Sequence, residues 1–531
     1  MFKKLAAIFT IVAVLGVIAV PALAAGAGGL ELPITEKPLQ LRMWAQRLGS
    51  YRGSDYNEKV SFQEMEKRTN IKMDFEVSTG TGYEEQFNLM MASQDLPDLI
   101  LYAAWDKHAA NYGHQGALLP LEDLIAEHAP NFSRILEEYP ELRGQITAAD
   151  GHIYYMPNLA LEGQLLVQMY PQIRFDWLEK LGLEEPVTTE DWYHVLKAFK
   201  EQDVNGNGID DEVPFVAVNI SNLMMMWAPA WGFNYQGAQT GFFIEDGVVK
   251  YSPYEDRFVE LLEFLNRLYA EGLLDPTYAS GDYSTNYANL REKVVNDVTG
   301  AWVGWAGSFM NTFRSLKADD PDFWIGPISP PKGPHGHQWH ISARWQSSGI
   351  GIAVASTTKH PVEAIKWLDY QYSEEGILLN NFGVEGVSYD MVDGYPKFKP
   401  HVFDNPDGLS PEESLLQYVP GGGSWATVSD GRYLEQYNPP EPAGYTVAER
   451  VAPYVNMSRM LPPVQFTPEE QRELAPIMMD LTTFVEENVN NFILGRRPLS
   501  EFGKFQESLK KMQVEKVLSI YQDAYDRFMS Y

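Results

Sequence analysis

Alternating apolar and polar side chains near the N-terminus constrain the fold more than any other feature of this chain. Leu39–Trp44 and Ile71–Val77 follow the period of two that half-buried strands show. Asp98–Leu101 is a third, shorter strand pattern, and helical patterns at Asn57–Arg68 and Tyr83–Ser93 separate the three. This order of strands and helices predicts a parallel sheet with helices outside it. Ligands on such sheets bind at the carboxyl ends of the strands.

Further helices follow from start signals and apolar periodicity. Thr188 or Thr189 is expected to cap a helix whose buried face is Trp192, Val195, Leu196 and Phe199. The other predicted helical segments run from Ser252-Pro253 to Gly272, from Pro361 to about Tyr372, and from Leu499 to Met529 as two amphipathic helices. Two regions rich in Gly, Pro and aromatic residues, Ala301–Trp345 and Glu385–Pro463, are predicted to be irregular and functional.

Length and charge limit the class of protein. A chain of 531 residues exceeds what one hydrophobic core supports, so we expect two lobes. The formal net charge of −31 opposes nucleic acid, whose affinity comes from neutralising phosphates. The chain has no cysteine, which excludes disulfides, thiol catalysis and a lipid-modified cysteine.

The first residues have the pattern of a secretory signal peptide. Lys3 and Lys4 precede an apolar run, Leu5–Val20, that is too short and wrongly flanked for a membrane-spanning helix. Small residues follow Pro21, so we expect a signal peptide over residues 1–25, cleaved near Ala24 or Ala25. An uncleaved membrane anchor is the alternative. Export without a lipid anchor favours the periplasm, with an extracellular location as second choice.

One loop has the composition of a calcium site. Calcium takes six to eight oxygen ligands, and a tight turn can bring alternate side chains onto one ion. The candidate donors are the side chains of Asp203, Asn205, Asn207, Asp211 and Glu212 with the backbone carbonyl of Ile209. Gly208 lies at position 6, but Pro214 replaces the usual bidentate Glu of an EF-hand at position 12. We expect a structural Ca²⁺ here; a polar turn without an ion is the alternative.

Several segments together resemble a known family, in the expected order along nearly the whole chain. The chain is similar to family 1 extracellular solute-binding proteins of ABC importers, in the large carbohydrate-binding branch that includes the alginate-binding proteins. The segments that carry this resemblance are Ala92–Asp98, Gly151–Pro157, Ile173–Gly182, Leu196–Lys200 with the loop after it, Asn381–Gly386 and Ala524–Phe528.

The resemblance implies a periplasmic-binding-protein fold, with two α/β lobes joined by crossing hinge segments around a ligand cleft. The expected N-terminal lobe is 30–157 plus about 305–380, and the C-terminal lobe is 158–304 plus about 381–531. The implied function is capture of an oligosaccharide by hinge closure and delivery to an ABC permease and its ATPase, without catalysis. The family's calcium site corresponds to the loop described above and lies away from the sugar. We expect a monomer.

Sugar sites pair aromatic planes with convergent polar groups, because sugar rings present flat C–H faces and a rim of hydroxyls. The candidate aromatic contacts are Trp44, Tyr102, Trp105, Trp227, Trp231, Trp302, Trp305, Trp339, Trp345 and Trp425. For Ala301–Trp305 two interpretations stay open, a buried strand or a sugar platform, and we favour the platform for Trp305. Arg344, Arg174 and Arg52 are candidates for hydroxyls or a uronate carboxylate, in that order. Whether the sugar is neutral or uronic stays open.

Three other functions are weighed against this one. A secreted glycoside hydrolase or lyase needs catalytic groups such as two carboxylates across the bond, and no segment presents such a pair recognisably. A dockerin-like interaction module needs two calcium loops, and this chain has one. His335, His337 and His340 are spaced as in some zinc sites, but no nearby carboxylate pattern supports a metal there.

Overall fold

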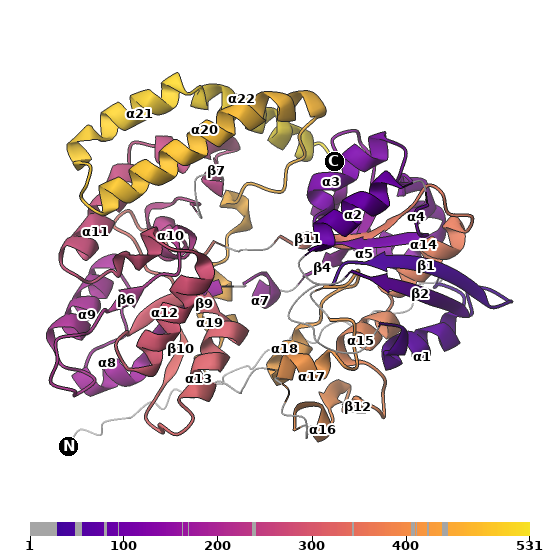
Figure 1. Cartoon of the computed structure of the whole chain (residues 1–531), viewed down its shortest axis with the longest axis horizontal. Helices are drawn as coiled ribbons and strands as arrows, with labels where there is room; N and C mark the ends of the chain where they lie inside the picture. Colours follow the sequence, from indigo (N-terminus) through magenta and orange to yellow (C-terminus); the bar gives the residue numbers. More distant parts are fainter. Residues whose placement is uncertain are drawn as a thin grey trace, which may run out of the picture.

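The computed structural model describes residues 29–47, 56–78, 82–93, 95–161, 163–167, 169–235, 240–341, 345–404, 409, 411–421, 424–437 and 444–531. The expected signal peptide lies outside these residues. The described chain forms two lobes that lie side by side (Figure 1). No helix in this part of the chain is both long and apolar enough to cross a lipid bilayer.

A five-stranded mixed sheet organises the first lobe. Its strands, in spatial order, are β2 (Ile71–Val77), β1 (Leu39–Ala45), β3 (Leu99–Tyr102), β11 (Ser347–Val354) and β4 (Tyr155–Leu159). β1 pairs in parallel with both β2 and β3, which confirms the predicted parallel arrangement. β11 was not predicted; it enters between β3 and β4 and runs antiparallel to both.

Helices cover both faces of this sheet because successive strand side chains point to opposite faces. Met43 and Leu101 join the core on one face, and Trp44 and Ile100 join the core on the other. The first face is covered by α1 (Val60–Thr69), α4 (Glu122–His128), α5 (Pro130–Glu138), α6 (Glu141–Ile146) and α14 (Pro361–Tyr370). The second face is covered by α2 (Tyr83–Ala92) and α3 (Trp105–His114).

A four-stranded sheet organises the second lobe. Its strands, in spatial order, are β10 (Ile325–Pro327), β5 (Met169–Arg174), β9 (Ala301–Trp305) and β6 (Phe215–Val216). The larger core beside it contains α8 (Phe175–Leu181), α9 (Thr189–Glu201), α10 (Ile220–Trp227), α11 (Phe258–Ala270), α20 (Pro468–Ile493), α21 (Phe502–Lys511), α22 (Val514–Phe528) and the hairpin β7 (Phe242–Glu245) and β8 (Val248–Tyr251). A smaller core contains α12 (Tyr283–Val295) and α13 (Thr312–Leu316).

The helix that leads into the candidate calcium loop forms as predicted. Thr188 is its N-cap, and its hydroxyl accepts a hydrogen bond from the backbone N–H of Asp191 at 3.1 Å. The Asp191 carboxylate accepts one from the Thr188 N–H at 2.8 Å, which completes a capping box. The predicted face of α9 is buried, so the end of this helix is held firmly where the loop begins.

The two regions predicted to be irregular contain regular elements. The first holds β9, a π-helix at Ala306–Asn311 (labelled η7), α13 and β10. The second holds β12 (Tyr389–Val392), β13 (Tyr395–Phe398), α16 (Pro400–Phe403), α17 (Pro411–Leu415), α18 (Gly431–Tyr437) and α19 (Val447–Arg450). With α15 (Glu374–Phe382), several of these surround a small satellite core.

Two segments pack differently from the expected domain boundaries. β10 pairs with β5, so the chain up to Pro327 lies with the second sheet. Trp425 packs in the core of the first lobe, and the buried Lys59 ammonium donates a hydrogen bond to the carbonyl of Leu416. The described residues between 382 and about 430 therefore lie beside the first lobe. The other boundaries stay predictions.

The chain crosses between the lobes at three places. The first crossing runs from β4 through α7 (Gly163–Leu166) to β5. The second runs from β10 to β11. The third follows Val428, which bridges to Leu159 of the first lobe, and precedes Val451, which lies in the smaller core of the second. The end of the chain also reaches back to the first lobe (Figure 1). The Tyr531 hydroxyl lies 3.5 Å from the Ala148 carbonyl oxygen.

Candidate functional site

One edge of each sheet lies where the chain crosses between the lobes. In the first sheet this edge holds the carboxyl ends of β1, β3 and β4 and, because β11 is antiparallel, the amino end of β11. β4 leaves this edge and reaches Met169, the first residue of β5. Met169 pairs with Trp305, the last residue of β9. We call these two edges the facing edges, and they are where ligands of such sheets bind.

Trp305 presents its ring at the facing edge of the second sheet. Among the tryptophans in the described ranges it is the most exposed, at 37 %. Tyr283, at the start of α12, is 43 % exposed, and its hydroxyl accepts a hydrogen bond from the Trp305 side chain. Ala301–Trp305 is therefore a strand whose Trp302 is buried and whose Trp305 forms an exposed aromatic pair with Tyr283. Sequence reasoning missed Tyr283, because a single tyrosine at a helix start carries no pattern.

Three of the predicted aromatic contacts have no exposed surface, so in this conformation they are core residues. The indole N–H of Trp105 donates to the carbonyl of Gly351 at 3.1 Å. The indole of Trp302 donates to Gln172 at 2.7 Å, and that of Trp425 donates to Gln371 at 3.1 Å. Complete burial of these three rings leaves no ring face for a ligand. Trp227 also has no exposed surface, although its indole N–H has no hydrogen-bond partner among the described residues.

The remaining aromatic candidates are mostly covered by neighbouring rings. Trp44 and Tyr102 lie at the facing edge of the first sheet but under α2, where the Phe87 ring stacks on Tyr102 at 3.9 Å. Trp231 packs against Phe264. Trp345 is half-buried and packs with Trp339 in a small cluster. Arg344 and Arg52 lie outside the described residues.

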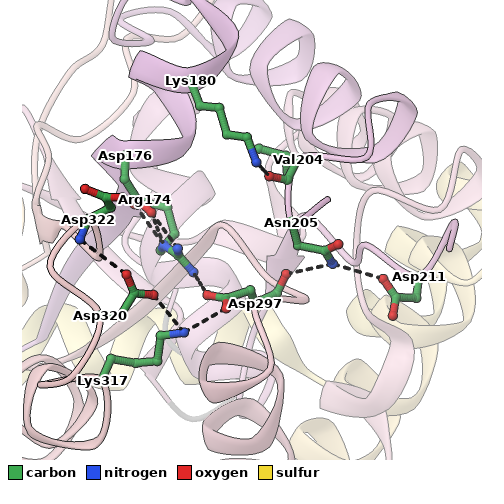
Figure 2. A network of polar contacts seen from close by, with 10 residues as sticks. All are labelled: Arg174, Asp176, Lys180, Val204, Asn205, Asp211, Asp297, Lys317, Asp320 and Asp322. Atoms are coloured by element: carbon green, nitrogen blue, oxygen red, sulfur yellow. Dashed lines mark hydrogen bonds and ion pairs between the residues drawn. The ribbon is translucent and has the colours of Figure 1, made fainter. Parts of the chain in front are cut away.

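Arg174 is a structural residue, which corrects its prediction as a sugar contact. Its guanidinium donates to Asp176 at 2.8 Å and to Asp297 at 2.7 Å (Figure 2). It also lies 4.5 Å from the centroid of the Phe323 ring, and the side chain is only 4 % exposed. The two carboxylates and the ring surround the Arg174 guanidinium, so it is not available to bind a hydroxyl or a uronate.

Short side-chain turns shape the candidate calcium loop between α9 and β6. The Asp203 carboxylate accepts from the N–H of Gly208 at 2.9 Å, and Asn205 accepts from the N–H of Asn207 at 2.9 Å. Asn207 accepts in turn from the N–H of Ile209 at 2.7 Å. These hydrogen bonds hold the side-chain oxygens of positions 1, 3 and 5 against the turn, as the predicted ligand spacing requires.

Two carboxylates complete the donor set of this loop. Asp211 accepts from the side-chain amides of both Asn205 and Asn207, at 3.2 and 3.1 Å. Glu212 is only 1 % exposed, and its Oε1 is a buried atom with no hydrogen-bond partner in the described part of the chain. A buried carboxylate oxygen without a proton donor is costly unless a cation or proton neutralises it. The donors therefore fit a hard cation.

The loop carboxylates are not gathered around one point in this conformation. Across the described ranges, no group of three or more His, Cys, Asp or Glu side chains is placed to hold a metal ion. Binding of a cation to the loop would thus require Asp203, Asp211 and Glu212 to close around it.

The histidines of the 335–340 segment also have separate partners. His335 lies 2.6 Å from Glu260, and buried His340 lies 2.9 Å from the Met169 carbonyl oxygen.

A polar network ties this loop to the second sheet, at the edge away from Trp305. The side-chain amide of Asn205 donates to the backbone carbonyl of Asp297 at 3.2 Å, and Lys180 donates to the carbonyl of Val204 (Figure 2). The Asp297 carboxylate binds Arg174 at the end of β5 and Lys317 at 2.7 Å. Arg174 and Asp297 flank the strand ends opposite the facing edge, so the loop supports the sheet from its far side.

The family model for bacterial extracellular solute-binding proteins matches residues 52–377 of the chain. A curated relative is the fructooligosaccharide ABC transporter substrate-binding protein FusA of Streptococcus pneumoniae serotype 4 (strain ATCC BAA-334 / TIGR4). It is 29 % identical over 94 % of this chain and 93 % of its own length. Relatives are thus described as transport binding proteins.

Solved structures of similar fold cover almost the whole chain. The alginate-binding protein AlgQ2 without calcium ion has a TM-score of 0.70 and 29 % identity, over 93 % of this chain and 99 % of that one. The S. pneumoniae FusA protein in complex with kestose has a TM-score of 0.68 and 25 % identity, over 92 % and 99 %. An EF-hand mutant of FusA has also been solved, with a TM-score of 0.69, 25 % identity and the same coverage. These neighbours establish the periplasmic-binding-protein fold.

The structural assignment of Arg174 is tested by Arg174→Met. This change leaves Asp176 without its cation and removes one of two cations from Asp297, and breaking a buried pair costs about 3 kcal/mol or more. Chemical denaturation is expected to show this loss in the free energy of unfolding. The control is Arg472→Met, whose partner Glu469 is exposed, and which should cost less than about 1 kcal/mol. Equal, small losses in both variants would contradict the assignment.

Proposed function

Because this chain belongs to the bacterial extracellular solute-binding protein family, we propose that it captures an oligosaccharide between its two lobes and delivers it to the membrane permease of an ABC importer. The observation that carries the proposal is Trp305: an exposed indole at the facing edge of the second sheet, beside the exposed ring of Tyr283. A flat aromatic surface beside a crossing segment suits the C–H face of a sugar ring. Relatives named for fructooligosaccharide and alginate binding support the same ligand class.

The mechanism is closure of the lobes around the sugar. Three crossing segments connect two separate cores, so the lobes can rotate about them without repacking either core. A sugar that touches both facing edges has more contacts in the closed arrangement and therefore shifts the population towards it. The closed form would then be the one that the permease recognises. The ligand leaves unaltered, because the proposed role requires no bond to break.

The ring of Trp305 should contribute most of the aromatic contact to the ligand. Trp305→Ala is expected to weaken binding of an oligosaccharide at least about tenfold, because loss of a central aromatic contact typically costs about 2 kcal/mol or more. Isothermal titration calorimetry with kestose, nystose and an alginate trisaccharide measures this change. Since Trp305 is 37 % exposed and lies at a strand end, the melting temperature should fall only slightly.

Met479→Ala is the matched control, since Met479 is 68 % exposed on α20 and away from the facing edges. It should bind as the wild type does. Binding by Trp305→Ala at wild-type affinity would contradict the assigned contact. Release of new reducing ends from the oligosaccharides at enzyme-like rates would contradict the transport role itself.

The proposed location is outside the cytoplasmic membrane, in the periplasm. The family consists of extracellular solute-binding proteins, and the expected signal peptide over residues 1–25 supports export. The absence of cysteine from the sequence argues against a lipid anchor and thus for retention behind an outer membrane. We propose that the protein acts there as a monomer.

The loop from Asp203 to Glu212 is proposed to bind a structural calcium ion. The side chains of Asp203, Asn205, Asn207, Asp211 and Glu212 and the carbonyl of Ile209 would hold it. The ion would offset most of the charge of three carboxylates, among them the buried Glu212, and hold the C-terminal end of α9 against the second sheet. The relative with an EF-hand mutant supports this assignment.

Removal of calcium should lower thermal stability. A ligand of the native state stabilises it by mass action, by about 2.7 kcal/mol at one hundred times its dissociation constant, so chelation should lower the melting temperature by about 3–6 °C. Differential scanning calorimetry with a chelator and then with excess calcium measures this shift. Glu212→Gln should abolish the calcium-dependent part of it.

Asp210→Asn is the control within the same loop. Asp210 is 81 % exposed and points to Lys200 instead of into the donor set, so this variant should keep the full calcium response. Native mass spectrometry reports the bound metal directly. The proposal would be contradicted if the wild-type protein showed no bound calcium and if neither the chelator nor excess calcium changed its melting temperature.

A further inference from the structure

A carboxylate lies at the facing edge of the first sheet, opposite in the fold to Trp305. Asp106 is in the first turn of α3, directly after β3. Its carboxylate lies over Gly349 of β11, where a Cβ atom would be 2.5 Å from Asp106 Oδ1. Gly349 also has a positive φ of +74°, so only glycine fits both requirements there. The backbone of β11 is thus shaped to admit this side chain.

Hydroxyl groups of the neighbouring strands gather beside this carboxylate. Tyr155 of β4 lies over Gly351, where a Cβ atom would be 2.5 Å from the tyrosine ring, two residues along β11 from the glycine that Asp106 covers. Ser347 and Ser348 begin β11 at the same edge. We call Asp106, Tyr155, Ser347 and Ser348 the Asp106 cluster.

The cluster contains more hydrogen-bonding capacity than the described protein uses. The buried hydroxyl of Ser348 has no hydrogen-bond partner among the described residues, and the buried hydroxyls of Tyr155 and Ser347 interact with each other. Tyr155 is 2 % exposed and Ser347 is 6 % exposed. Buried polar groups are normally hydrogen-bonded, so hydroxyls with unused hydrogen-bonding capacity at a facing edge indicate a polar ligand.

The groups that favour the charged form of Asp106 all lie on its own helix. They are the Lys107 ammonium, the backbone N–H groups of Lys107 and Asp106 itself, and the His108 ring. Burial raises the pKa of the Asp106 carboxyl, because desolvation disfavours the ionised form. Sugar hydroxyl groups that donate to the carboxylate would offset this cost, whereas a second carboxylate would add repulsion.

We propose that the Asp106 cluster is the hydroxyl-binding wall of the sugar site and that it selects neutral oligosaccharides over uronic ones. This inference rests on the proposed function. Asp106 accepts hydrogen bonds from sugar hydroxyls, and the hydroxyls of Tyr155 and the two serines complete the set. Arg174, which could have balanced a uronate, is already paired with Asp176 and Asp297 at the far edge of the other sheet. The net charge of −31 further disfavours an anionic ligand.

The test compares two sugar classes on a small set of variants. Isothermal titration calorimetry measures the affinities of kestose and nystose, which are neutral, and of alginate and galacturonate trisaccharides, which are uronic. The wild type should bind at least one neutral sugar and should prefer it over the uronic sugars at least tenfold. Asp106→Asn keeps the shape of the side chain and removes its charge. It should weaken neutral binding at least tenfold and reduce the preference against uronic sugars.

Tyr155→Phe and Asp123→Asn separate binding from stability. Tyr155→Phe removes only the hydroxyl, whose partner within the protein is the Ser347 hydroxyl, so it should weaken neutral binding several-fold and change the melting temperature little. Asp123 is an exposed carboxylate on α4 of the same lobe, and its change to Asn should leave affinity and preference unaltered. These variants keep the test informative if Asp106→Asn folds poorly.

The outcomes distinguish this inference from the function on which it rests. A wild type that prefers a uronic sugar would overturn the inference and leave the oligosaccharide-binding function standing. If neither Asp106→Asn nor Tyr155→Phe alters the affinity for neutral sugars, the inference is also overturned and the oligosaccharide-binding function stands. A wild type that binds no carbohydrate of either class would overturn the proposed function and the inference together.

Discussion

A sheet covered by helices on both faces leaves only its strand ends for a ligand. Both sheets of this protein have this arrangement: in the first, Trp44 and Ile100 point to one helical layer while Met43 and Leu101 point to the other. The crossing from β4 to β5 then fixes which ends lie between the lobes, because Met169 pairs with Trp305. The position of every proposed ligand contact depends on this one constraint.

The same constraint separates stability from binding in the second lobe. β5 and β9 are antiparallel, so the strand ends near Arg174 and Ala301 lie opposite the end that carries Trp305. The polar network of Arg174, Asp297 and the loop from Asp203 to Glu212 gathers at this far end (Figure 2). A calcium ion there would stiffen the sheet from which Trp305 projects without touching the sugar. Arg174 was predicted as a sugar contact because sequence does not show which partners surround a guanidinium.

The sequence predicted local structure well and packing poorly. The alternation at Leu39–Trp44 and Ile71–Val77 determines strand and face, because both follow from local periodicity. The helical patterns between the strands determine the parallel order. β11 enters the first sheet from far along the chain, which no local pattern indicates. Helix α20 escaped notice because Pro476 interrupts its pattern. Tryptophans outside helices were taken as contacts, yet several fill cores. The Asp106 cluster was missed as well; its available signal was the pair Gly349 and Gly351, which alternate on one face of a strand.

The central claim is that two lobes close on an oligosaccharide between the facing edges. The absence of cysteine allows one cysteine to be placed on each lobe, at exposed Lys72 of β2 and exposed Met479 of α20, for spin labelling. Pulsed electron paramagnetic resonance then measures the distance between the labels without and with saturating oligosaccharide, with binding to the labelled protein verified by calorimetry. The account predicts a distance distribution that shifts and narrows when sugar binds. An unchanged distribution at saturation would contradict it.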